Sequence, residues 1–443
     1  MKSTTILLVL TSGIACGDTD EARATFGDPA ASGLSGLGED GSEPTDGNGD
    51  ADDDDDDSPG DAGDDDDDDA ADDGPKFDAA VMPDLAPGTG CGGSGDGGGG
   101  DLEFSYIWIA NSTQNTISKI DTVTMVEEGR YYTRETGGNP SRTSVNLSGD
   151  VAVANRQGGL TKFYARAEDC TDLDGNGVID SSTGVDDVLP WGTEECMAWF
   201  TPFQYSSQRP VAWTAGTLDE STCEYEDQKV WTTGVHAGQI EVVRVDGETG
   251  VVEDSVMIPE VPAGALGFGF YGGAVDAAGN FWTTKLHGGA LVRTNYADLS
   301  YKVYDQPHGG YGMTVGSQGY IWTCSTKVGR FDPVAETWTG VQVGGSGGCM
   351  EDGNGTLWMA NDPLVAVDTT TLTVVQTVDL PKYVRGVSVD FHGNVWAVSI
   401  GTDAYRVDPA TGAFETLTGL TGAYTYSDMT GFALGNVSGI PTG

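Results

Sequence analysis

From about residue 104 onward, apolar residues occur in short runs separated by turn residues. Runs such as YIWIANST (106–113), DAAGNFWTTK (276–285) and DFHGNVWAVS (390–399) are rich in Val, Ile, Trp and Thr, with Gly, Asn or Asp between them. No stretch keeps a 3.6-residue apolar period between capping residues, as an amphipathic helix would. The pattern predicts an all-β domain over residues 104–443 with almost no helix.

Tryptophan recurs at the second or third position of these runs and reveals a repeated unit. In each unit a small-residue strand comes first, such as YGGAVD (271–276), followed by a Gly-containing turn and the Trp strand. A third strand ends in an Asp-led turn, and a Thr- and Val-rich strand closes the unit. In another copy, Ala152 stands in place of the Trp. The Trp positions are Trp108, Trp231, Trp282, Trp322, Trp358 and Trp396, and the last five are 51, 40, 36 and 38 residues apart.

Four antiparallel strands repeated at about 40–45 residues are typical of a β-propeller blade. The units predict a seven-bladed β-propeller of four-stranded antiparallel blades. The run MTGFALGN (429–436) is similar to a first strand without a Trp strand, and YIWIANST is a Trp strand without a first strand. We expect these N- and C-terminal strands to pair and close the ring, because closure removes the exposed sheet edge.

The repeat G-x-x-V-D-x-x-G-N-x-W, followed by a third strand and D-P-x-T-G, resembles the streptogramin lyase-like (virginiamycin B lyase-like) seven-bladed propellers and the broader NHL-type propellers. The resemblance covers about residues 104–436 and indicates the fold more specifically than the function. The lyases of this family hold Mg²⁺ with glutamates on the channel-mouth face, commonly three residues after the blade Trp, and use a histidine as base. The resemblance implies the same residues at these positions here. No Glu stands at the matching positions, which are Asn111, Gly234, Lys285, Ser325, Asn361 and Ser399.

The N-terminal residues 1–16, MKSTTILLVLTSGIAC, have the layout of a secretory signal. Small residues before Cys16 resemble a lipobox, so we expect a lipid anchor at Cys16, with plain secretion as the alternative. Residues 17–103 are rich in Asp and Gly and predict a disordered acidic tether. Together with the propeller, these features resemble surface lipoproteins of myxobacterial type. We expect an exported chain anchored at the outer membrane or cell surface of a Gram-negative bacterium.

Charge narrows the possible partners. The chain has 69 acidic and 21 basic residues and a formal net charge of −48. Residues 1–100 contain 27 of the acidic and 3 of the basic residues, so each part of the chain is strongly negative. A phosphate backbone would be repelled, and we expect no nucleic-acid partner. We expect a monomer that meets an unknown extracellular or periplasmic ligand.

The segment CTDLDGNGVIDSSTGVDD (170–187) resembles a calcium loop of the EF-hand or dockerin type. Gly177 supplies the sharp turn, and Thr183 stands where a bidentate acid is expected, so Asp186 or Asp187 would have to substitute. The alternative is an Asx-rich surface loop without an ion. We favour a structural Ca²⁺ within an insertion at 170–196. The predicted ligands are Asp172, Asp174, Asn176, Val178 and Asp180.

Three histidines are expected at one rim of the ring. His236 and His287 both follow their Trp by five residues, and His308 precedes the next first strand. One interpretation is that each imidazole bonds a backbone carbonyl in a Gly-rich loop. The other is a ligand or metal site, with Mg²⁺ only if the chain is a lyase. The further ligand-binding candidates are Lys285, Asn361, Asp362 and Arg385.

Six cysteines besides Cys16 form an even number in an exported chain, so three disulfides are plausible. Cys170 and Cys196 bracket the calcium-like loop, and Cys324 and Cys349 lie on neighbouring blades. By elimination Cys91 would pair with Cys223, although fifteen pairings exist in all.

The sequence favours a surface binding module for a carbohydrate, peptide or protein ligand without catalysis of its own. The alternative is a metal-dependent lyase or hydrolase with His236, His287 or His308 as base. The two hypotheses differ in whether these side chains meet a carboxylate at the channel mouth.

Overall fold

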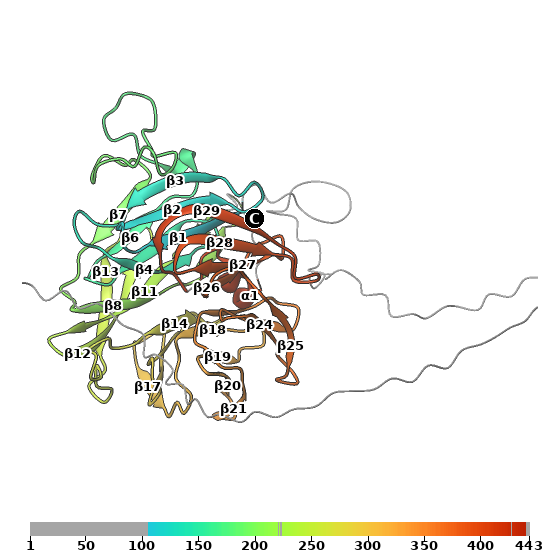
Figure 1. Cartoon of the computed structure of the whole chain (residues 1–443). Coiled ribbons are helices and arrows are strands. Elements are labelled where there is room, and N and C mark those ends of the chain that lie inside the picture. Colours follow the sequence, from blue (N-terminus) through green and yellow to red (C-terminus); the bar gives the residue numbers. More distant parts are fainter. Residues whose placement is uncertain (1–104, 220, 222–223, 427, 440–443) are drawn as a thin grey trace, which may run out of the picture. The chain divides into compact units, whose positions relative to one another are not determined.

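The computed structural model describes residues 105–219, 221, 224–426 and 428–439, and the structural statements below concern these residues (Figure 1). They form antiparallel strands, one short 3-10 helix and one short α-helix. In this part of the chain, neither helix is long and apolar enough to cross a membrane.

Most strands belong to seven blades, β9 and β10 form a separate two-stranded sheet, and the two helices lie outside the sheets. In chain order the elements are β1 (Tyr106–Asn111), β2 (Thr116–Asp121), β3 (Glu127–Tyr132), β4 (Pro140–Val145), β5 (Val151–Asn155), β6 (Leu160–Phe163), η1 (Ala167–Asp169), β7 (Met197–Thr201), β8 (Ser207–Trp213), β9 (Thr217–Asp219), β10 (Glu224–Glu226), β11 (Lys229–His236), β12 (Gln239–Asp246), β13 (Val252–Met257), β14 (Gly272–Val275), β15 (Phe281–Thr284), β16 (Leu291–Thr294), β17 (Tyr301–Tyr304), β18 (Gly312–Val315), β19 (Ile321–Cys324), β20 (Lys327–Asp332), β21 (Thr337–Gln342), β22 (Cys349–Glu351), β23 (Thr356–Met359), β24 (Leu364–Asp368), β25 (Val374–Val378), β26 (Val384–Val389), β27 (Val395–Ser399), β28 (Gly401–Val407), β29 (Phe414–Ala423) and α1 (Phe432–Ser438).

The sheets form a closed ring. Five sheets have four strands each, in the orders β4-β5-β6-β7, β8-β11-β12-β13, β14-β15-β16-β17, β18-β19-β20-β21 and β22-β23-β24-β25. A seven-stranded sheet joins the last blade, β26-β27-β28-β29, to β1-β2-β3 of the first. The inner strands contact one another in succession, from β4 through β8, β14, β18 and β22 to β26. The predicted all-β, seven-bladed propeller is confirmed.

The ends of the folded region pair as expected, although only the first residue of the suggested run MTGFALGN takes part. Ala423 at the end of β29 pairs with Asn111 of β1. The amide of Tyr424 then donates to the Ala110 carbonyl at 3.0 Å, and the amide of Trp108 donates to the Met429 carbonyl at 2.8 Å. This segment thus occupies the innermost position of the first blade and closes the ring.

The run MTGFALGN, expected as a strand, instead enters α1, so Phe432 is not in a sheet with Ile109 and that prediction was wrong. Helix formation follows from packing, since Ala433, Leu434 and Val437 point into a cavity of about 30 Å³ that inner-strand residues also line. Gly431, with φ of 87°, precedes the first turn in a backbone conformation that glycine adopts readily. In Figure 1, α1 lies among the labels of the inner strands, and it contacts β18 and β26.

The recurrent tryptophans are fully buried wedges, and their indole N–H groups need acceptors. In three blades the acceptor is the Asp that opens the preceding turn. In blade five Gly316 occupies that position, and Glu351 of the next blade accepts from Trp322 at 3.1 Å instead. The three Asp–Trp pairs are Asp276–Trp282 at 2.9 Å, Asp352–Trp358 at 3.3 Å and Asp390–Trp396 at 2.8 Å.

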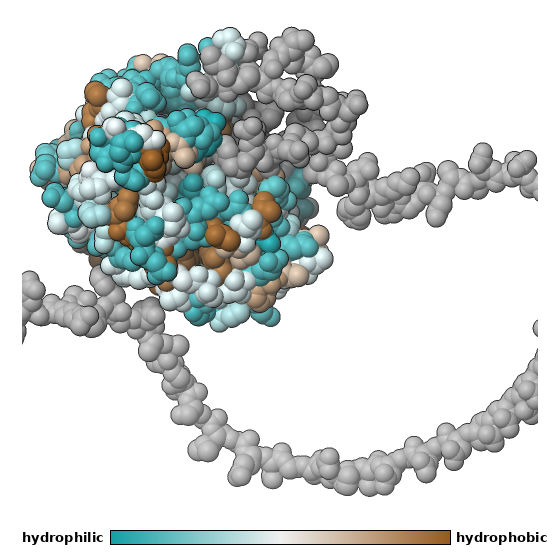
Figure 2. Space-filling model, turned by 90° about the horizontal axis from the view of Figure 1, so that it is seen from above, coloured by the Kyte–Doolittle hydropathy of each residue, from teal (hydrophilic) through white to brown (hydrophobic). Residues whose placement is uncertain are grey.

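The outer surface is mostly polar. On the face seen in Figure 2, hydrophobic residues form small separate patches among hydrophilic ones. The most exposed apolar side chains are single residues such as Val334, Val178 and Leu173, which belong to turns and loops. Scattered apolar residues of this kind are normal for a surface and do not mark a docking area.

Candidate functional site

The two ends of the ring carry different loops. At one end lie the loops between the second and third strands of each blade and the connections from each blade to the next inner strand. We call this end the channel mouth. The turns that contain the Asp–Trp pairs and the insertion between β6 and β7 lie at the opposite end, because successive strands in each blade are antiparallel.

Four tyrosines gather on the axis at the channel mouth, and we call them the tyrosine cluster: Tyr271, Tyr311, Tyr424 and Tyr426. Tyr271 and Tyr311 stand immediately before the inner strands β14 and β18, and the other two belong to the segment that closes the ring. The Tyr424 hydroxyl lies 3.2 Å from that of Tyr271 and also bonds that of Tyr311. Ring centroids in the cluster are 4.7 to 5.6 Å apart.

Arg142 of β4 crosses the axis beneath these rings. Its guanidinium donates to the Tyr311 carbonyl at 3.0 Å and the Tyr426 carbonyl at 3.2 Å, and it also bonds the Tyr271 carbonyl. The same group lies 3.2 Å from the Tyr426 ring centroid. These hydrogen bonds join β4 to three other blades. Arg142 is fully buried, so its side chain occupies the channel at this level.

Three further arginines surround the tyrosine cluster and stack on aromatic rings; we call Arg156, Arg209 and Arg385 the mouth arginines. Arg156 lies 4.4 Å from the centroid of Tyr424. The other two each bridge two rings, and stacking of this kind orients a guanidinium while its edge still offers N–H donors. The pairs are Arg209 with Phe268 at 4.3 Å and Tyr271 at 4.8 Å, and Arg385 with Tyr383 at 4.7 Å and Tyr311 at 4.8 Å.

Electrostatics at the mouth follow from this arrangement. Burial alone would raise the pKa of Tyr426, but the positive charges of Arg142, Arg209 and Arg156 outweigh it and lower the pKa to about 8. Burial raises the pKa of Tyr271 and of Tyr311, so both remain neutral phenols that can donate hydrogen bonds. The mouth therefore offers cationic and phenolic donors together.

The three predicted histidines do lie at the channel mouth, His236 at the end of β11 and the other two in loops, but each has a different environment. His236 is exposed, and its Nδ1 is 3.2 Å from the Gln204 carbonyl. His287 is exposed, and His308 packs edge-on against Trp338 of the outer strand β21. In the described part of the chain, no group of three metal-ligating side chains includes a histidine.

The predicted ligand-binding residues are also at the mouth, but only Arg385 joins the tyrosine cluster. Lys285 donates to the Pro262 carbonyl at 2.7 Å, and burial lowers the pKa of its amine. Asn361 is buried and donates to the Gly344 carbonyl at 3.3 Å, whereas Asp362 is exposed. These three side chains lie in loops of blades four and six.

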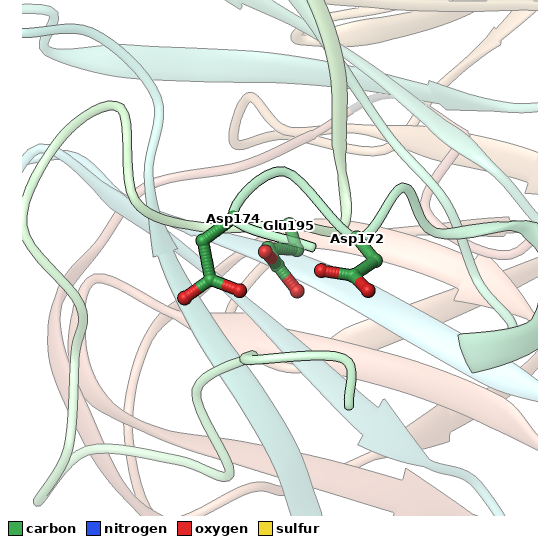
Figure 3. Close-up of side chains that lie close together, drawn as sticks. All are labelled: Asp172, Asp174 and Glu195. Carbon is green, nitrogen blue, oxygen red and sulfur yellow. The ribbon is translucent and has the colours of Figure 1, made fainter. Parts of the chain in front are cut away.

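The calcium-like insertion brings three carboxylates together at the opposite end (Figure 3). Ligand atoms of Asp172, Asp174 and Glu195 lie within 4.8 Å of one another, and the three side chains point toward a common space. Amides of the loop, that of Gly177 foremost, lower the pKa of Asp172, so the carboxylate is ionised. This oxygen-rich group suits a hard cation such as Ca²⁺.

Other predicted loop residues surround the triad. Asn176 donates from its side-chain amide to Asp180 at 3.2 Å, and Val178 is exposed. Asp187, weighed as the closing ligand, instead accepts hydrogen bonds from Thr183. The sequence did not point to Glu195, whose two oxygens accept from the amides of the loop at 2.7 Å.

The structure contains the disulfides Cys170–Cys196 and Cys324–Cys349. The first explains the position of Glu195, because it holds the turn before β7 beside the start of the loop. The remaining cysteines, Cys16, Cys91 and Cys223, lie outside the described residues.

Sequence reasoning missed the whole tyrosine cluster and two of the mouth arginines, Arg156 and Arg209. A signal existed, because an Arg or Tyr stands just before the small residues of several first strands. These places are Arg209 before PVAW, Tyr271 before GGAV, Tyr311 before GMTV and Arg385 before GVSV.

Comparison with known proteins supports the fold and goes no further. No family model and no curated protein matches the chain. Among solved structures, the chain is similar to a functionally unknown protein from Desulfotomaculum acetoxidans DSM 771, with 10% identity over 73% of this chain and 100% of that chain and a TM-score of 0.53. It is also similar to a catalytically inactive virginiamycin B lyase from Staphylococcus aureus with quinupristin (16% identity, 71% of this chain, 88% of that chain, TM-score 0.45). A streptogramin B lyase gives 15% identity, 66% and 87% coverage and a TM-score of 0.45.

Proposed function

We propose that this chain is an exported, lipid-anchored surface protein whose propeller binds an extracellular ligand at the channel mouth without transforming it. The observation that carries the proposal is the tyrosine cluster, where three phenol hydroxyls converge on the axis beside stacked guanidinium groups. Aromatic faces and a few convergent polar groups are typical of small-ligand and oligosaccharide sites. Tyr424, Phe268 and Tyr383 are partly exposed and offer the first contact.

Among the ligand classes considered, a carbohydrate fits these groups better than a peptide or protein. Phenol hydroxyls both donate and accept hydrogen bonds, as sugar hydroxyls do. A peptide that adds as a strand would need a free sheet edge, and the inner strands are enclosed by the ring.

Binding is favoured over catalysis by the placement of the acidic and basic groups. The histidine suited to act as a base in a lyase would need a carboxylate-held metal beside it. In the described residues, the one group of three carboxylates is at the opposite end of the ring. We therefore propose Ca²⁺ at Asp172, Asp174 and Glu195 as a structural ion that stiffens the insertion.

The test is a glycan and peptide array probed with the full chain, as wild type and as Tyr424→Ala. Tyr320→Ala is a matched control, because Arg330 lies 4.7 Å from the Tyr320 ring much as Arg156 lies over Tyr424. We expect glycan signals that Tyr424→Ala abolishes and Tyr320→Ala keeps. Signals on peptides alone, or glycan signals untouched by Tyr424→Ala, would contradict the proposal.

A further inference from the structure

We infer that the bound carbohydrate carries an oxyanion, a uronate carboxylate or a sulfate ester, which the mouth arginines hold at the edge of the tyrosine cluster. This inference rests on the proposed function and adds the charge of the ligand to it. It follows from the partners of the arginines, from the contrast with the rest of the propeller, and from the donors that they leave available.

The mouth arginines lack the carboxylate partner that most basic residues of the propeller have. Within the described ranges, ten basic side chains form ion pairs with a carboxylate. None of the mouth arginines takes part in these pairs. Three guanidinium groups without a carboxylate partner, in a chain of net charge −48, are an unusual concentration of uncompensated positive charge.

The cost of this arrangement indicates a ligand. Placing cations close together and partly out of water is unfavourable unless an anion compensates them. Acidic residues are plentiful in the propeller, so a structural role would be served by pairing these arginines internally, as at Arg130 with Glu127 at 2.7 Å. An external anion supplies the missing partner.

The geometry also leaves donors in place. One terminal nitrogen of Arg156 donates to Asn139 Oδ1 and one of Arg385 to the Ser346 carbonyl. The other terminal nitrogen of each half-buried side chain has no acceptor among the described residues and can donate to a ligand at the mouth. Both guanidinium groups are held against rings of the tyrosine cluster. Guanidinium edges bind carboxylate and sulfate oxygens through paired N–H donors.

The same neighbours favour an anionic sugar over an acidic peptide. A sugar ring places its hydroxyls next to its carboxylate or sulfate, and the mouth places phenol hydroxyls next to guanidinium groups. Uronate and sulfate share this chemistry, so the experiment must separate them.

Titration calorimetry with the full chain tests the inference. The probes are an oligogalacturonate, its neutral methyl ester, a sulfated galactan oligosaccharide and an oligo-aspartate peptide. We expect at least one anionic saccharide to bind about tenfold or more tightly than the neutral ester, and added salt to reduce the difference. Whether the oligogalacturonate or the sulfated galactan binds shows whether the anionic group of the ligand is a carboxylate or a sulfate ester.

The variants are Arg156→Gln, Arg385→Gln and the double variant, whose side chains are only half-buried, with melting temperatures measured alongside. Arg330→Gln is the matched control, because Arg330 likewise lacks an ion pair, stacks on Tyr320 and donates to the Thr369 carbonyl at 2.6 Å. The double variant should lose the preference for the anion and the control should keep it.

Three results would overturn the inference: equal binding of acid and ester, an anion preference that survives the double variant, or tighter binding of oligo-aspartate than of both anionic saccharides. A fourth result would separate this inference from the proposed function. If a neutral glycan binds, and its binding depends on Tyr424 but not on the mouth arginines, the proposed function stands and this inference is wrong.

Discussion

The recurrent Asp–Trp pair makes a quantitative prediction about stability, which Asp390→Ala tests. Asp390 is fully buried and accepts from the amides of His392 and Asn394, both at 2.9 Å, and from the Trp396 indole at 2.8 Å. The Asn394 side-chain amide donates to it as well, at 3.1 Å. One carboxylate thus closes the turn and fixes the wedge between blades.

The magnitude follows from which donors can find water afterwards. The two backbone amides lie in a partly exposed turn, so their loss costs about 1 kcal/mol each. The Trp396 indole is fully buried, and leaving its N–H unsatisfied costs about 1–3 kcal/mol. We expect Asp390→Ala to lower the free energy of unfolding by about 3–5 kcal/mol.

The matched control is Asp332→Ala. Asp332 also opens a turn and accepts from the amides of Val334 and Ala335, at 2.8 and 2.9 Å, but it holds no tryptophan. Its loss should cost about 1–2 kcal/mol, because both amides can turn to water and no buried donor is left behind.

Urea unfolding of the full chain, followed by tryptophan fluorescence, measures both variants at equilibrium. Asp390→Asn should fall between them, because the amide keeps one acceptor oxygen but turns an N–H toward the indole. The reasoning fails if Asp390→Ala is no more destabilising than Asp332→Ala.

Three further predictions concern the insertion and the channel. Ca²⁺ should raise the melting temperature of the wild type but not of the Asp172→Asn, Asp174→Asn double variant, and an equal response would exclude the triad as the site. Tyr426, with a pKa lowered from 10.0 to about 8, should titrate first in the tyrosinate absorbance, a step absent from Tyr426→Phe. Between about pH 8 and 10 Tyr426 is deprotonated in the folded chain but still protonated in the unfolded chain. Its contribution to the free energy of unfolding should therefore grow over this pH range. Burial raises the pKa of Asp428 from 3.8 to about 6. The free energy of unfolding should therefore be highest, as far as Asp428 decides it, below pH 3.8, and should fall by at most about 3 kcal/mol as pH rises through 6. Asp428→Asn should remove that pH dependence, and an unchanged profile in denaturant titrations would refute it.

Much of the fold could be predicted because each blade repeats the same short sequence pattern. A buried Trp on the second strand and a turn before it recur with enough regularity to count the blades. The exceptions are places where a distant residue replaces a local one. Glu351 compensates for Gly316 across a blade boundary, and α1 forms where a strand was expected because Leu434 can be buried in the channel. Neither outcome is visible in a period-2 pattern.

The candidate site was less predictable, because it is made of positions that do not repeat. Tyr271, Tyr311 and Arg385 come from three blades and meet only when the ring closes on its axis. The calcium-like loop was readable from its alternating acids, yet Glu195 joins it through the chain's return at Cys196. Local patterns identified the residues of one segment, and closure of the ring decided which segments meet.

The channel itself limits what the ligand can be. Arg142 spans the axis and bonds carbonyls contributed by three other blades. At the far end, α1 contacts β18 and β26 and, with residues of the inner strands, lines a cavity of about 30 Å³. A cavity of this volume holds a few water molecules at most and is too small for a sugar ring. The ligand of the proposed function would therefore rest on the mouth, across the tyrosine cluster, where the ring does not restrict its length. Polymers of an anionic sugar satisfy this condition, since only one of their residues needs to lie over the axis while the rest extend over the neighbouring loops.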